Sequence, residues 1–275
     1  MGSLLAGCGT PFQSREHVSL TAPMPADRLV VRNQVGEIIV HADPEAAQIK
    51  AEAVKIARAS TQTAADNAVA DILVALTTKH DETGTIVASV EHPSLCSTRG
   101  YEVQWRVTAP PGLAVEIQGS VGDVEVCGFE SQAVVNIDIG DVAARCLPNG
   151  LQARTSTGDI RAEAGGPIDL WTALGDLHLH LLSGKPGPVS VHTDLGTVQV
   201  RLPSDRQGRL VANSKLGSLR LRLEGIAMRT LRQRGQHFDA ELAGQADPAM
   251  NLDTDLGDVI VTTYPADETA ERHSE

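Results

Sequence analysis

Aromatic side chains are scarce in this 275-residue chain, where they make up only 3% of the sequence. A core of this composition must be narrow and filled by valine, leucine, isoleucine and alanine, and the scarcity speaks against an aromatic platform for sugars. No run of eighteen apolar residues occurs, so no membrane-spanning helix is predicted. The net charge of −12 argues against nucleic acid as a partner, because contacts with phosphates need basic side chains.

The short motifs of common enzymes are also missing. The sequence holds no Gly-x-Ser-x-Gly, no His-Glu-x-x-His, no phosphate-binding loop and no Cys-x-x-Cys. We therefore expect no catalytic residue, no metal ion and no cofactor.

What the chain does have is a repeat. A glycine, a small or acidic residue and an apolar–any–apolar triplet recur together, with the glycine at positions 36, 122, 140, 158, 175, 196, 217 and 257. From Gly122 to Gly217 the glycines step by 18, 18, 17, 21 and 21 residues, which fits two short strands and two turns. A repeat of nearly fixed period indicates similar units stacked on one another.

Each unit alternates between apolar and polar residues. The residues two and four after the glycine are aliphatic in every unit, and those five and seven before it are aliphatic except for Met250. Leu177 and Leu179 are therefore predicted to face inward and His178 and His180 outward. Hydroxyl residues three positions before the glycine are expected to form a column at one corner: Thr155, Thr172, Thr193, Ser214 and Thr254.

These patterns predict an all-β fold. We expect a repetitive β-solenoid or β-roll with a small helix-containing insertion near the N-terminus, and a β-sandwich is the alternative. One domain is predicted over residues 27–262, with an inserted α+β segment at 43–114 whose alanine-rich stretch 61–75 predicts a short helix. In the long gap between Gly217 and Gly257, a unit without its glycine is expected, with a strand at 237–242.

The two ends of the chain have different compositions. Residues 263–275 are polar and charged and are predicted to be a disordered tail. Residues 9–26 are rich in serine, threonine and proline and are expected to form a flexible tether.

Leu5-Ala6-Gly7-Cys8 matches a bacterial lipobox, which predicts that Cys8 is lipidated and that residues 1–8 are the remnant of a lipoprotein signal. The basic and longer apolar segments of a signal peptide do not precede it, so either the true start lies upstream or the match arises by chance. With the anchor, the protein would sit in the cell envelope as a membrane-anchored lipoprotein, on the periplasmic or surface side.

Four features carry a resemblance to a known family. They are residues 32–40 (RNQVGEIIV), the alanine-rich helix predicted after them, residues 107–113 (VTAPPGL) and the serial Gly-Asp units through Val261. Over residues 27–262 the chain resembles the bacterial "putative adhesin" family, a β-strand-repeat domain of unknown function. The resemblance implies export or membrane tethering and supplies no catalytic residues.

Several side chains are candidates for a site. The acidic residues beside the turn glycines could bind Ca²⁺ or act as acid and base, but turn chemistry explains them better: Glu37, Asp123, Asp141, Asp159, Asp176 and Asp258. His178 and His180 have the spacing of a chelating pair, yet no carboxylate or cysteine is placed with them, so solvent-facing positions are expected.

Cysteines and arginines give two further candidates. Cys127 and Cys146 follow successive glycines and could form a disulfide, with Cys96 as a competing partner and free thiols as the alternative. Residues 201–234 are rich in arginine, and Arg201, Arg220 and Arg222 form a candidate anion-binding face, with a solvated face as the alternative.

The expected function is that of a non-enzymatic cell-envelope β-repeat protein with a scaffold or adhesion-like role. Its partner would be an anionic glycan, a lipid headgroup or another envelope protein, and not a nucleic acid. A polysaccharide-active β-helix enzyme and an envelope-stress sensing or regulatory module are the alternatives.

Overall fold

The protein is described here by a computed structural model that covers residues 12–23, 26–79, 84–91, 98–244 and 247–266. The all-β class is confirmed, because these residues form 21 strands and a single helix, α1 (Gln62–Asp71). None of the described residues belongs to a helix long and apolar enough to cross a membrane. The sequence stretch that contains Cys8 lies outside the described residues.

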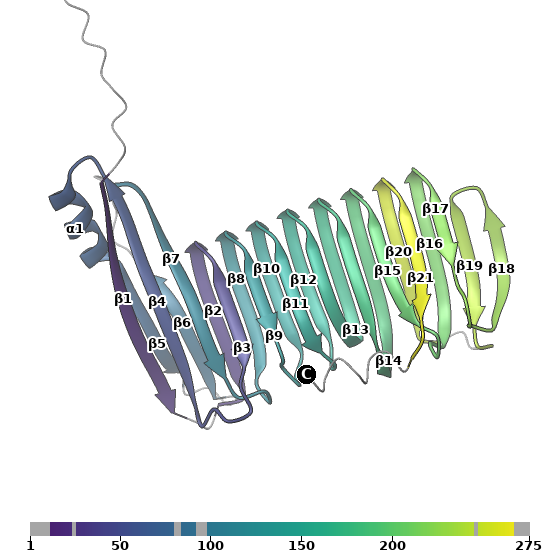
Figure 1. Cartoon of the computed structure of the whole chain (residues 1–275), viewed down its shortest axis with the longest axis horizontal. Helices are drawn as coiled ribbons and strands as arrows, with labels where there is room; N and C mark the ends of the chain where they lie inside the picture. Colours follow the sequence, from purple (N-terminus) through teal and green to yellow (C-terminus); the bar gives the residue numbers. More distant parts are fainter. Residues whose placement is uncertain (1–11, 24–25, 80–83, 92–97, 245–246, 267–275) are drawn as a thin grey trace, which may run out of the picture.

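Most strands belong to two rows joined by the turn glycines (Figure 1). The first row precedes the glycines and contains β2 (Arg28–Val35), β8 (Ala114–Val121), β10 (Ala133–Ile139), β12 (Leu151–Thr157), the second halves of β13 (Ile160–Leu174) and β14 (Leu177–Leu195), β20 (Ala249–Leu256) and β16 (Gly208–Leu216). The second row follows the glycines and contains β3 (Ile38–Ala42), β9 (Val124–Cys127), β11 (Val142–Leu147), the first halves of β13 and β14, β15 (Val198–Pro203), β21 (Val259–Tyr264) and β17 (Leu219–Arg222). Neighbours in each row run parallel, with equivalent residues of successive units side by side, and we call this arrangement the parallel stack.

The order of units in space differs from their order in the sequence. The strands β20 and β21 insert between the unit of Gly196 and the unit of Gly217. Between them in sequence, β18 (Met228–Arg234) and β19 (His237–Leu242) form an antiparallel hairpin that pairs with β16 and covers that end of the first row. The strand predicted at 237–242 is confirmed, but the extra parallel unit is wrong, because the chain reverses at Gly235, where φ is 56°.

The other end of the parallel stack is covered by the N-terminal segment and the insertion. Here β6 (Thr85–Glu91) and β7 (Thr98–Ala109) continue the two rows in parallel, and β5 (Leu73–Lys79) and β4 (Gln48–Ala59) add to them in antiparallel fashion. The alanine-rich helix exists but ends at Asp71, because Ile72 is already extended and leads directly into β5.

The flexible tether predicted over 9–26 is wrong for its central part. Residues 12–23 form β1 (Phe12–Pro23), which pairs with β4 along its whole length. Val18, Leu20 and Ala22 alternate with polar residues and pack towards the core, so this segment has a strand pattern in spite of its serine and threonine content.

The core runs between the two rows along the parallel stack. The aliphatic positions predicted to be buried are buried, except Leu219 and Leu221, which lie on the edge strand β17 and are half-buried. Leu177 and Leu179 face inward as predicted, with exposed fractions of 0% and 2%. Each such side chain contributes about 1.5–3 kcal/mol of burial free energy, so the core grows with every added unit.

The turns are packed so closely that only glycine fits in them. At Gly158 a β-carbon would lie 2.0 Å from the carbonyl oxygen of Gly140, and φ is 141°. The predicted hydroxyl column is present at the same corner: the Thr172 hydroxyl donates to the carbonyl oxygen of Gly158 at 3.1 Å, and equivalent bonds recur along the parallel stack. The turn corner is therefore fixed by contact between successive glycines and by buried hydroxyl groups.

This geometry predicts that Gly158→Ala destabilises the protein by about 3–5 kcal/mol, because the β-carbon overlaps the Gly140 carbonyl and the residue is also held at positive φ. The free energy of unfolding from urea titrations measures the loss. Two glycines at which an added β-carbon would meet no atom within 4 Å serve as controls, and they separate the two causes.

Gly100 also has positive φ, at 152°, so Gly100→Ala should show backbone strain alone, about 1–2 kcal/mol. Gly112 is free of both constraints, and Gly112→Ala should stay within about 0.5 kcal/mol of the parent. A Gly158→Ala variant no less stable than Gly100→Ala would contradict the close packing of the turns.

Candidate functional site

The acidic column beside the turn glycines is used by the fold. The Asp123 carboxylate accepts a hydrogen bond from the backbone N–H of Asp141 at 2.9 Å, Asp141 accepts from Asp159, and Asp159 accepts from Asp176. Asp176 and Asp258 make the same contact to Thr197 and Ser218. Among the described residues, no cluster of histidine, cysteine, aspartate or glutamate is arranged to hold a metal ion.

The predicted anion-binding face is spread over β15 and β17, which are separated by β21. Arg220 lies 3.3 Å from the Asp258 carboxylate, and the Arg201 guanidinium stacks over the Tyr264 ring at 5.5 Å. Arg222 is exposed on the same strand as Arg220. The structure does not gather the three arginines around one point, and anion binding stays a prediction.

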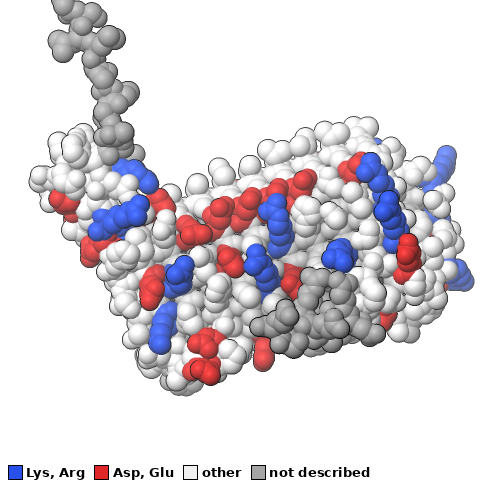
Figure 2. Space-filling model, viewed as in Figure 1, with Lys and Arg blue, Asp and Glu red and all other residues white. Residues whose placement is uncertain are grey.

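Other basic residues of the segment 201–234 have partners. Arg209 makes two hydrogen bonds to Asp239, Lys215 pairs with Asp255 at 2.6 Å and Arg229 pairs with Glu241 at 2.6 Å. Arg206 is buried, donates to the carbonyl oxygen of Gly187, and has its pKa lowered by that burial. Figure 2 shows acidic side chains in a line over the middle of one face of the stack, with basic side chains scattered over the same face and at its right-hand end.

Cys127 and Cys146 lie together, as the repeat spacing predicts. They lie near the ends of the paired strands β9 and β11, and both are free cysteines. Burial and the neighbouring Cys127 raise the pKa of Cys146 to about 11, so this thiol is a poor nucleophile at neutral pH. The disulfide stays a prediction, and Cys96 lies outside the described residues.

His178 and His180 occupy outward positions of the second row, as predicted, but both are half-buried. His180 packs edge-on against Tyr264, with ring centroids 4.5 Å apart. The expected solvent-facing position is therefore met only in part by His180, whose ring belongs to a local aromatic contact.

A groove on the outward face of the first row is the best candidate for a binding site. It has a volume of about 680 Å³ and crosses β8, β10, β12, β13 and β14. In-register pairing places five outward side chains in one line across these strands: Gln118, Asn136, Arg154, Trp171 and His192. We call this surface the Trp171 groove.

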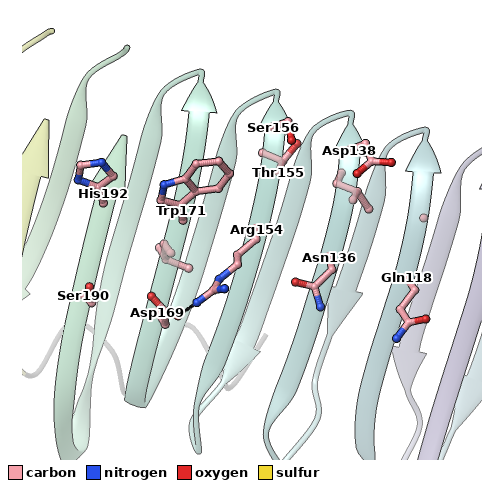
Figure 3. Close-up of a pocket in the computed structure, with 13 residues that line it drawn as sticks. Gln118, Asn136, Asp138, Arg154, Thr155, Ser156, Asp169, Trp171, Ser190 and His192 are labelled. Carbon is pink, nitrogen blue, oxygen red and sulfur yellow. Dashed lines mark hydrogen bonds and ion pairs between the residues drawn. The ribbon is translucent and has the colours of Figure 1, made fainter. Parts of the chain in front are cut away.

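Figure 3 shows how the side chains of the Trp171 groove lie. The Trp171 indole lies between His192 on β14 and Arg154 on β12, and it is partly exposed. Arg154 reaches across to Asp169 and pairs with it at 2.7 Å, while His192 bonds to Asp194 at 2.9 Å. The two side chains on either side of the indole, Arg154 and His192, thus each have an acidic partner.

Two groups in the groove are available to a ligand. The Asn136 side-chain amide and the Trp171 indole N–H have no hydrogen-bond partner in the part of the chain that the structure describes, and both side chains are partly exposed. An amide offers two donors and an acceptor, and an indole offers one donor beside an apolar ring.

The carboxylates of the groove are not placed for glycoside hydrolysis. Asp138 on β10 and Asp169 on β13 are two strands apart and four residues out of line, so their α-carbons are about 16 Å apart. The paired carboxyl groups of glycosidases are about 5–9.5 Å apart. Asp169 is also engaged by Arg154.

A second surface feature follows the turn corner. The residue just before the turn glycine is a large exposed aliphatic in most units, with exposed fractions of 44–67%: Val121, Ile139, Leu174, Leu195, Leu216 and Leu256. Its backbone carbonyl accepts from the glycine N–H of the adjacent unit, so these side chains stand in one row.

Sequence reasoning missed both the groove and the aliphatic row. One residue of the sequence could have indicated the groove. Trp171 is the only aromatic residue at its position in the repeat, four residues before the glycine. The equivalent residues of the neighbouring units are polar, so a tryptophan among them is not explained by the core.

No protein-family model matches the sequence, and no curated protein matches it either. Among solved structures, the chain is similar to a "putative cell adhesion protein" from Clostridium sporogenes (12% identity, TM-score 0.38, covering 92% of this chain and 100% of that one). It is also similar to a "putative adhesin" from Bacteroides fragilis (13%, 0.42, 91% and 98%) and a "putative lipid binding protein" from Parabacteroides distasonis (8%, 0.36, 92% and 97%).

The similarity to proteins named adhesins, expected from the sequence, is thus found again among solved structures. With identities of 8–13% and TM-scores of 0.36–0.42, it assigns neither a family nor an activity to this chain.

The acidic column predicts a pH effect at Asp258. Hydrogen bonds from the Ser218 backbone N–H and hydroxyl lower the pKa of Asp258, with a smaller contribution from Arg220. A lowered folded-state pKa stabilises the protein above the unfolded pKa of about 4, and the contribution is lost as the pH falls through the folded value.

We therefore expect Asp258→Asn to be less stable than the parent at pH 7, and the difference to shrink as urea titrations are moved below about pH 4. Asp138→Asn is the control, because that carboxylate has no hydrogen-bond partner in the described ranges. A stability difference for Asp258→Asn that does not change with pH would contradict this role.

Proposed function

We propose that this chain is a non-enzymatic β-solenoid of the cell envelope, anchored by a lipid on Cys8, that acts as an adhesion-like binding protein. The observation that carries the proposal is the Trp171 groove: a partly exposed indole and, among the described residues, an unpartnered amide, displayed on a stacked sheet without carboxylates at catalytic spacing. These features support binding over cleavage.

The parallel pairing of equivalent strands supports the solenoid architecture. Residues one repeat apart, such as Arg154 and Trp171, are side by side over successive units, as stacked coils require. An immunoglobulin-like sandwich would pair its strands in antiparallel fashion. Within the described ranges, antiparallel pairs are found only at the two ends of the parallel stack.

A polysaccharide-active enzyme is the second candidate. The presence of Trp171, Asp138 and Asp169 in one groove is the combination that favours it. The separation of about 16 Å between the two α-carbons speaks against it, because an acid and its partner carboxylate must flank one bond.

A lipid on Cys8 would lie close to the sheet. The strand β1 starts at Phe12, so four residues at most extend from Cys8 to the sheet, a reach of about 14 Å. Lipidation would hold the end formed by β1 and α1 near the membrane, and the Trp171 groove, which begins several strands away, would stay accessible. In this exported setting we also propose that Cys127 and Cys146 form a disulfide.

The anchor is tested in native cells. We expect the protein to fractionate with membranes and Cys8→Ser to be released, because bacterial lipoproteins depend on that thiol for acylation. Cys127→Ser is the control and should stay with membranes. Mass spectrometry that finds an unmodified peptide across residues 7–9 would end the lipoprotein hypothesis.

The binding role is tested with soluble Cys8→Ser protein and isolated envelope fragments. We expect retention on the fragments to fall at least tenfold for Trp171→Ala, because the indole is the largest contact surface of the groove. Gln199→Ala, on the opposite face, is the control and should bind like the parent. Retention that does not depend on Trp171 would contradict binding through the groove.

A further inference from the structure

We infer that the Trp171 groove binds a neutral glycan chain laid across the strands. The inference rests on the proposed binding role and names its ligand class. It departs from the anionic partners that the arginine content of the sequence favours.

The indole provides the platform. The chain has two tryptophans, and Trp105 is 1% exposed and serves the core, so Trp171 is the one that can contact a ligand. A sugar ring presents C–H groups on its face and hydroxyls at its rim, which matches an indole that is apolar on its face and polar at its N–H.

Hydrogen-bonding groups lie on the same line as the indole. Asn136 is two strands from Trp171, and its amide has no partner among the described side chains, so it can donate to one sugar hydroxyl and accept from another. From Gln118 to His192 the groove crosses five strands, about 19 Å, which accommodates several linked sugar rings.

The charges of the groove favour a neutral ligand. Arg154 and Asp169 form an ion pair, which leaves the Asp138 carboxylate as the excess charge. A uronate or sulfated chain would meet an acidic residue and an arginine that is already paired. Its anionic groups would lose their hydration, and no unpaired cation among the residues that line the groove would compensate for that loss. A neutral chain has no such penalty.

The experiment measures binding of oligosaccharides to the soluble Cys8→Ser protein by calorimetry and tryptophan fluorescence. The neutral probes are hexasaccharides derived from cellulose, amylose, mannan and chitin, and the anionic probe is a hexasaccharide of galacturonate. We expect at least one neutral hexamer to bind, the galacturonate to bind at least tenfold more weakly, and the neutral binding to change less than about twofold between roughly 50 and 500 mM NaCl.

Variants locate the binding. Trp171→Ala should weaken it at least tenfold and Asn136→Ala about threefold to tenfold, while Trp171→Phe, which keeps an aromatic platform, should recover part of the affinity. Gln199→Ala, an amide on the opposite face, should bind like the parent. Thermal unfolding of each variant checks that the fold is intact.

Several results would overturn the inference: no binding of any neutral hexamer at millimolar concentration, equal or stronger binding of galacturonate, or neutral binding that is the same in Trp171→Ala. If envelope fragments still require Trp171 while no glycan binds, the groove has a protein partner, and the binding role stands without its glycan ligand. If neither fragments nor glycans depend on Trp171, both proposals fail.

Discussion

Successive turns of the parallel stack meet glycine to glycine. A β-carbon at Gly122, Gly140 or Gly158 would lie 2.0–2.3 Å from the carbonyl oxygen of the turn glycine in the neighbouring unit. This contact sets how closely two units approach, and it brings the strands on both sides of the turn to pairing distance with equivalent residues in line. In-register pairing then follows next to the turns, and the register shifts only farther away, in the pairs β11–β13 and β13–β14.

The same contact explains why the recurring polar residues of the repeat serve the fold. With the glycines this close, the carboxylate one position later reaches the next backbone N–H, as Asp141 does to Asp159, and the hydroxyl three positions earlier reaches a glycine carbonyl, as Thr172 does to Gly158. Both kinds of residue form hydrogen bonds with backbone groups at the turn corner, where strand pairing within the two rows leaves those groups without a partner. Chemistry that involves a ligand is thereby left to the outward strand positions, which the repeat does not constrain.

This division decides what could be predicted from the sequence. Inward positions such as Leu177 and Leu179 obey the period because each must fill the same narrow core, so burial and the all-β class follow from the pattern. The position of β20 and β21 inside the parallel stack could not be predicted, because every unit presents nearly the same surfaces to its neighbours and the order of insertion leaves no local signal. The strand β1 was missed because its pairing with β4 depends on a partner that lies in the insertion.

The Trp171 groove was missed for a related reason. Gln118, Asn136, Arg154, Trp171 and His192 are 17–21 residues apart in sequence and have no common chemistry, so only their register makes them one surface.

The two ends of the parallel stack help to keep the strands in this register. Open rows of parallel strands would invite further pairing. The antiparallel hairpin of β18 and β19 covers the first row at one end, and β4 and β1 extend the second row in antiparallel fashion at the other, while β17 stays an edge strand. Antiparallel strands therefore interrupt parallel addition at one end of each row, and the broad outward face of the first row, with its partly exposed indole, is a surface left open for recognition.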